Sequence, residues 1–139
     1  MSNTLKPFPA EPDKLWPVDH LPACTAHPLG DRLNEQDLLY YFDGPLLFTC
    51  SQGGVTYLAC ASAEGELVVR YFVARVSDAL VDDVKRDRVT IFDALNQPEL
   101  WLVDTWLDNS IVEVRRLHGL DAAPVDARPA RDVFLHVQG

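Results

Sequence analysis

The sequence predicts an α+β domain: a twisted antiparallel sheet of five or six strands with two short helices on one face. Apolar runs of strand length recur along the chain, tight-turn sequences separate them, and one segment changes to helical spacing. A chain of 139 residues is the size of one domain. We expect a proline-rich N-terminal arm over residues 1–30, a core domain over residues 31–118 and a C-terminal tail over residues 119–139.

The N-terminal arm holds six of the ten prolines of the chain. Proline lacks a backbone donor and fixes φ, so neither a helix nor a central strand can run through this segment. Its most apolar stretch is residues 15–18, which contain Trp16. Two interpretations are open. This stretch either anchors the arm to the core domain or inserts into another protein or a second subunit.

The first half of the core domain is predicted to consist of strands joined by turns. The expected strands are residues 37–42, 46–51, 55–62 and 66–76. The expected turns are Asp43-Gly44-Pro45, Gln52-Gly53-Gly54 and Glu64-Gly65. Glycine permits positive φ in such turns, and aspartate can bond to its own backbone. The Gly-Gly turn places Cys50 opposite Tyr57. The same register places Cys60 opposite Leu47, so we expect no disulfide between these two strands.

The strand over residues 66–76 carries apolar side chains on both faces. Tyr71, Phe72 and Val73 are consecutive, so they point to alternate sides of the sheet. An antiparallel strand with one face in water alternates more cleanly between apolar and polar residues. We therefore expect this strand to be central and the sheet to serve mainly as core.

Two helices are predicted after this strand. Ser77 is a good N-cap for the first helix, whose apolar residues then recur at helical spacing. Thr90 is expected to cap a second short helix over residues 91–96. Pro98 prevents that helix from continuing.

Two more strands are predicted to complete the sheet, at residues 99–107 and 111–117. Val112 and Val114 are expected to face the core. Because the other side of this last strand is polar, the strand is expected near a sheet edge. Residues 133–137 in the tail either add an edge strand or stay loose.

The charge of the chain argues against a nucleic-acid partner. The formal net charge is −9 at pH 7 and the 12 lysines and arginines are scattered, whereas a phosphate backbone requires clustered cations. No apolar run approaches the roughly 20 residues needed to cross a bilayer, so we expect no membrane partner. The first residues lack an apolar signal segment, and three irregularly spaced cysteines are typical of a reducing compartment. We therefore expect a cytoplasmic protein.

One segment carries a recognisable pattern. It opens with aromatic-x-Asp-Gly-Pro and a hydrophobic strand, Tyr41-Phe42-Asp43-Gly44-Pro45-Leu46-Leu47-Phe48. It continues with Tyr57-Leu58, with Arg70-Tyr71-Phe72, and with a helix that begins after Ser77. This combination, over about half of the chain, resembles a family of small bacterial α+β domains of unknown function. The resemblance implies a compact α+β module and no particular activity, cofactor or catalytic residue.

His20, Cys24 and His27 are the most suggestive group for metal chemistry. A thiolate and two imidazoles are typical Zn²⁺ ligands, and Cys24 lies three residues before His27. Against a metal site stand the prolines within this stretch and the lack of a second paired half-site. The pattern therefore favours an ordinary arm segment over a zinc site.

Asp104 lies within an otherwise apolar strand. A buried carboxylate without a partner costs several kcal/mol, so Asp104 is either exposed or paired with a cation. Arg70 and Arg75 are the cations available on strands. Alternatively, Asp104, Arg70 and Tyr71 line a ligand pocket between the sheet and the helices.

The function that we expect is a non-catalytic protein-interaction or accessory module in a bacterial cytoplasmic system. Trp16, Trp101 and Trp106 are candidate partner-binding residues, since tryptophan is enriched at binding hot spots. The partner is expected to be another protein, or a second copy in a homodimer, that contacts the N-terminal arm or an exposed edge strand. The sequence has no nucleophile elbow, so we assign no catalytic residue and no cofactor. The alternative is a small ligand-binding sensor or enzyme.

Overall fold

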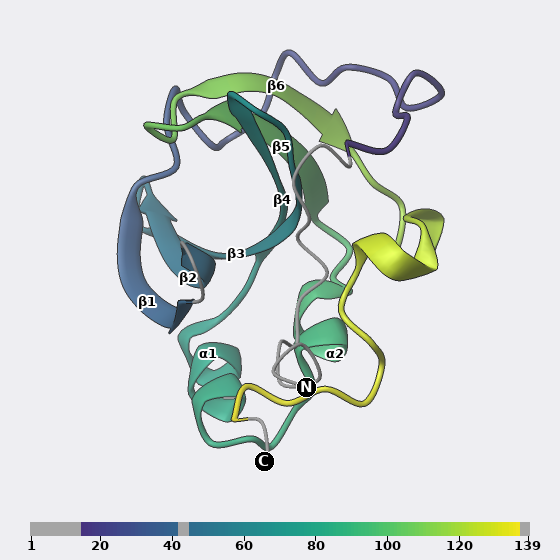
Figure 1. Ribbon diagram of the computed structural model, residues 1–139. Helices are drawn as coiled ribbons and strands as arrows, with labels where there is room; N and C mark the ends of the chain where they lie inside the picture. Colours follow the sequence, from purple (N-terminus) through teal and green to yellow (C-terminus); the bar gives the residue numbers. More distant parts are fainter. Residues whose placement is uncertain (1–14, 42–44, 137–139) are drawn as a thin grey trace.

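The computed structural model describes residues 15–41 and 45–136 of the chain. Within these residues six strands form one antiparallel sheet in sequence order, and two helices connect its fourth and fifth strands (Figure 1). The strands are β1 (Glu35–Tyr41), β2 (Pro45–Gln52), β3 (Val55–Glu64), β4 (Val68–Arg75), β5 (Leu100–Trp106) and β6 (Ile111–Arg116). The helices are α1 (Asp78–Lys85) and α2 (Ile91–Leu95). The predicted α+β class and antiparallel sheet are confirmed.

The hairpin between β2 and β3 has the predicted register. Cys50 lies opposite Tyr57, and Leu47 lies opposite Cys60. Gly53 and Gly54 make the turn at φ of 60° and 79°, a left-handed conformation that glycine adopts without steric cost. All three cysteines of the chain have free thiols. The predicted turn at Asp43-Gly44 lies outside the described residues.

Strand β4 is central and buried on both faces, as predicted. Phe72 and Val73, which point to opposite sides, are both fully buried. On the face of Val73, the ring of Phe48 on β2 meets Tyr71 at 5.3 Å between centroids. Strands two positions apart are separated by about 10 Å in a flat sheet, so such contacts favour the strong curvature that Figure 1 shows.

Both helices begin with the predicted caps. The Ser77 hydroxyl accepts a hydrogen bond from the Leu80 amide at 3.1 Å, and the Thr90 hydroxyl accepts one from the Asp93 amide at 3.2 Å. Figure 1 shows α1 and α2 together below the curved sheet, and α2 contacts β4. That both helices cover one face of the sheet stays a prediction. Neither helix is long and apolar enough to cross a membrane.

Residues 15–34, which we call the strap, run along the outer edge of β6. Backbone bridges join Ala23 to Arg115 and Arg32 to Ser110. The Cys24 amide donates to the Val114 carbonyl at 2.7 Å. The strap therefore occupies hydrogen-bonding positions of β6 that the sequence alone leaves open.

The last strand contains a bulge that the sequence did not predict, and the described part of the tail after it forms no further strand. Val112 was expected to face the core, and this is wrong, because its side chain is 44% exposed. The cause is a register shift: Asp104 pairs with Glu113 and Thr105 pairs with Ile111, so Val112 is the extra residue of a bulge.

The tail forms short 3-10 turns at η2 (Leu120–Ala122) and η3 (Val125–Ala127). Residues 133–136 form no strand, and Val137 lies outside the described residues.

Candidate functional site

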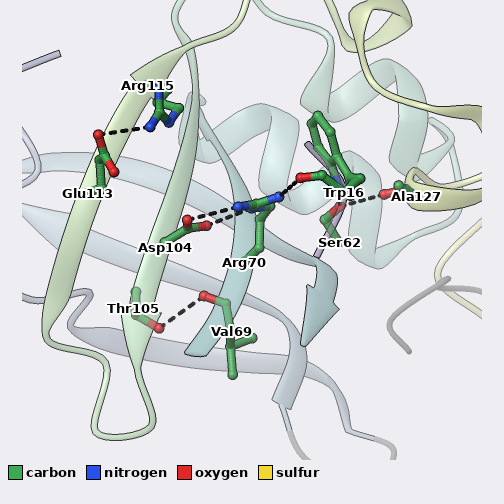
Figure 2. A network of polar contacts seen from close by, with 9 residues as sticks. All are labelled: Trp16, Ser62, Val69, Arg70, Asp104, Thr105, Glu113, Arg115 and Ala127. Atoms are coloured by element: carbon green, nitrogen blue, oxygen red, sulfur yellow. Dashed lines mark hydrogen bonds and ion pairs between the residues drawn. The ribbon is translucent and has the colours of Figure 1, made fainter. Parts of the chain in front are cut away.

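Arg70 and Asp104 form a bidentate ion pair between β4 and β5 (Figure 2). Arg70 Nε lies 2.7 Å from Asp104 Oδ1, and Nη2 lies 3.0 Å from Oδ2. The remaining terminal nitrogen of Arg70 donates to the Trp16 carbonyl, and its guanidinium carbon lies 5.2 Å from the centre of the Trp16 ring. Of the two alternatives left open for Asp104, exposure or pairing with a strand-borne cation, the structure shows the pairing, and the cation is Arg70.

Tyr71 does not share a site with this ion pair. It follows Arg70 in β4, so its side chain points to the opposite face of the sheet. Burial raises the pKa of the Tyr71 hydroxyl, with a smaller contribution from the charge of Glu64. The structure therefore brings together two of the three residues predicted to line a ligand pocket, and these two bind each other.

Trp16 packs against the core domain from the strap. Its indole Nε1 donates to the Ser62 hydroxyl at 2.9 Å, and Ser62 donates in turn to the Ala127 carbonyl at 2.7 Å (Figure 2). The Trp16 ring lies 6.5 Å from that of Phe72. Sequence reasoning missed Ser62, which links strap, sheet and tail, since a serine in an apolar strand gives no signal of its partners.

The other two candidate tryptophans lie in opposite environments. Trp101 is buried against Tyr57, with 6.0 Å between ring centroids. Trp106 is 48% exposed at the end of β5. The two residues are five positions apart in β5, so their side chains point to opposite sides of the sheet.

The described residues hold no group of three or more histidine, cysteine, aspartate or glutamate side chains placed to bind a metal ion. His20 is exposed, and Cys24 and His27 are partly buried. The Nδ1 atom of His27 accepts a hydrogen bond from the Leu29 amide at 3.2 Å, and the Cys24 thiol contacts the Ala26 carbonyl at 3.5 Å. Cys24 and His27 thus bond locally, and both line a hollow beside β6.

A polar hollow of about 420 Å³ lies between α1 and the ends of β1, β2 and β3. Its lining includes Asp37, Asp78, Asp82 and Lys85. The ammonium of Lys85 lies 3.0 Å from Asp37, and the Thr56 hydroxyl donates to Asp78 at 3.2 Å. Several of its polar groups therefore bind one another across the hollow.

Exposed apolar side chains gather at the opposite end of the central strands. Leu67, Trp106 and Leu107, which we call the tip patch, are 61%, 48% and 65% exposed. Val68 pairs with Trp106, so the β3–β4 turn and the β5–β6 turn are neighbours. Sequence reasoning named Trp106 but missed Leu67 and Leu107, because only this pairing brings the two turns together.

Comparison with known proteins adds no further assignment. No family model matches the chain, and no curated protein or solved structure is similar to it. The resemblance to small bacterial domains therefore stays a prediction, and any statement about function depends on the geometry described above.

Proposed function

We propose that the chain is a non-catalytic protein-interaction module and that the tip patch is its docking surface. The observation that carries this proposal is the exposure of three large apolar side chains: Leu67 and Leu107 on two adjacent turns, and Trp106 at the end of β5. Burying such side chains against a partner releases the free-energy cost of their hydration. Tryptophan in particular supplies much of the binding energy where it occurs at interfaces.

Hydrogen bonds within the two turns hold the patch in shape. The Gly65 amide donates to the Val68 carbonyl at 2.7 Å, and the Trp106 amide donates to the Ser110 carbonyl at 2.9 Å. The Asn109 amide donates back to the Trp106 carbonyl at 2.9 Å. A surface that is already ordered loses little conformational entropy when a partner binds, which favours docking here.

The edges of the sheet are less suited to docking than the tip patch. The strap bonds to β6, because the Cys24 amide donates to the Val114 carbonyl and the Ile111 amide donates to the Asp31 carbonyl. Strand β1 pairs with β2 through three register shifts, and such irregularities oppose the addition of another strand. An added strand requires a regular row of free backbone donors and acceptors, and neither edge offers one within the described residues.

The helices are attached away from the patch. Helix α1 follows β4 and α2 precedes β5 at the end where Ala74 pairs with Leu100, whereas the patch lies at the end where Val68 pairs with Trp106. Our proposal takes both helices to cover one face of a twisted sheet, which leaves the patch open to a partner. It also places the protein in the bacterial cytoplasm, where free thiols are typical.

The proposal is tested by site-specific photo-crosslinking in native cells. A crosslinking amino acid at position 107 is expected to capture a defined protein that the same residue at position 125 does not. Val125 on η3 is the matched control, because it is 77% exposed and lies outside the patch. Trp106→Ala should reduce capture at position 107. Identical capture at both positions, or none at position 107, would contradict the proposal.

The alternative is a small ligand-binding sensor or enzyme. The observation that favours it is the polar hollow between α1 and the sheet. A small molecule that raises the melting temperature of the protein, with the effect lost in Asp78→Ala and kept in Trp106→Ala, would support this alternative instead.

A further inference from the structure

We propose that the segment which docks on the tip patch is basic: apolar side chains bordered by lysine or arginine. This inference rests on the proposed function and names the chemical class of the partner. It is argued from the charges that surround the patch, because charge complementarity selects partners and accelerates their association.

Two carboxylates lie at the β3–β4 end of the patch, and neither has a cation partner among the described residues. Glu66 directly precedes Leu67 and is exposed, and Glu64 ends β3 opposite Val69. Neither carboxylate forms an ion pair with any described residue. Both are therefore available to a cation supplied by a partner.

The arginines near the patch are already paired. Arg70 is buried against Asp104. Arg115 lies farther from the patch, opposite Leu102, and is 3.0 Å from Glu113. Arg32 lies 3.3 Å from Asp108, the residue that follows Leu107. These three pairs cancel their own charges, so among the described residues the net charge around the patch comes from Glu64 and Glu66 and is negative.

The sign of this charge excludes several kinds of occupant. A nucleic-acid backbone and the anionic leaflet of a membrane are both repelled by it. An acidic or neutral protein segment would bring the carboxylates of Glu64 and Glu66 into a partly desolvated interface without compensation. A segment with basic residues beside its apolar side chains would pair with both carboxylates. The net charge of −9 also attracts such a segment over longer distances.

The test uses the full chain and two synthetic amphipathic peptides. One is composed of leucine and lysine, and the other has glutamate in place of every lysine. Binding is measured by isothermal titration calorimetry and by the tryptophan emission of the chain, which should shift to shorter wavelength when the exposed ring of Trp106 is covered. The leucine–lysine peptide is expected to bind and the leucine–glutamate peptide is not.

Matched variants locate the binding on the protein. Trp106→Ala and Leu107→Ser should each weaken binding about tenfold or more, and Val125→Ser should leave it unchanged. The double variant Glu64→Gln, Glu66→Gln should weaken binding about threefold at low salt and not at about 1 M salt, where charges are screened beyond about 3 Å. Asp126→Asn beside Val125 is the charge control, and it should have no effect.

Several results would overturn the inference. These are equal binding of both peptides, an equal effect of Asp126→Asn, or a loss of affinity in the double variant that is as large at about 1 M salt as at low salt. A dimer that Leu107→Ser converts to monomer would show that a second copy covers the patch. An increase in peptide affinity on Phe8→Ser would show that the chain's own first residues cover it. If crosslinking at position 107 captures a protein and the leucine–lysine peptide still fails, the proposed function stands and only the basic partner is rejected.

Discussion

Arg70 on β4 and Asp104 on β5 face each other across the centre of the sheet, with both oxygens of the carboxylate bonded to the guanidinium. The side chain of Arg70 is 5% exposed and that of Asp104 is 18% exposed. A pair buried to this degree is costly to break, because the remaining charge stays in a poorly hydrated site. It also holds the carbonyl of Trp16, so it couples the strap to the sheet.

Removing one member of this pair should destabilise the fold. Asp104→Ala leaves the charge of Arg70 buried beneath Trp16, and we expect a loss of about 3 kcal/mol in the free energy of unfolding. Urea denaturation followed by circular dichroism measures this loss. Asp108→Ala is the control, since its pair with Arg32 is more than half exposed on both sides, and its loss of stability should be much smaller. Equal losses in the two variants would contradict the structural role of Asp104.

Removing the hydroxyl of Ser62 should destabilise the fold. Ser62→Ala removes the hydroxyl that accepts from Trp16 and donates to Ala127, which leaves two polar groups without this partner. We expect a loss of about 1–2 kcal/mol in the free energy of unfolding. Ser51→Ala, in a partly exposed position on β2, serves as the control and should change stability by less than about 0.5 kcal/mol.

Asp87 should make stability depend on acid pH. Its pKa lies below its usual value, first because the backbone amide of His136 donates to it and also because the His136 ring bonds to it. The unfolded chain therefore binds the proton more readily, so this contribution is complete above about pH 4 and is lost as pH falls further.

Asp87→Asn tests this dependence with little change in shape, because asparagine tolerates the φ of 56° found at this residue. The variant should be less stable than the native chain at pH 7, and the difference in urea midpoint should shrink below pH 4. A difference that stays constant down to about pH 2 would refute the assignment.

The three thiols should react in a fixed order. Burial raises the pKa of Cys50 to about 12, with a further contribution from the charge of Glu35, and burial also raises the pKa of Cys60. Cys24 is partly exposed in the strap. Iodoacetamide at about pH 8 should therefore modify Cys24 in the native protein, and Cys50 and Cys60 only after unfolding. Peptide mass spectrometry reads the three sites separately, and native labelling of Cys60 would contradict the buried register.

Local rules were sufficient for most of the elements. Period-two alternation, glycine turns and hydroxyl caps act over a few residues, so the sequence predicted the β2–β3 register and the caps Ser77 and Thr90. The ends of the strands shifted by two residues or fewer from the predicted ranges. Such rules do not report a bulge, which is why Val112 was placed on the wrong side.

The candidate site was only partly predictable. The sequence offered Asp104 two possible cations, and the register of β4 against β5 selected Arg70, while Arg75 lies 3.5 Å from Glu99 instead. That register is set across the helical connection, where turn chemistry gives no information. The same pairing of Val68 with Trp106 creates the tip patch, which no pattern within either turn reveals.

The sequence by itself determined the kind of each element and the central position of β4, because these follow from the residues within one turn or one strand. The tertiary structure alone decided that the strap closes the edge of β6, that Arg70 and Asp104 meet beneath Trp16, and that Leu67 lies in the turn beside Leu107. The physical reason is range: backbone conformation is a local property, whereas the meeting of distant segments depends on packing of the whole core.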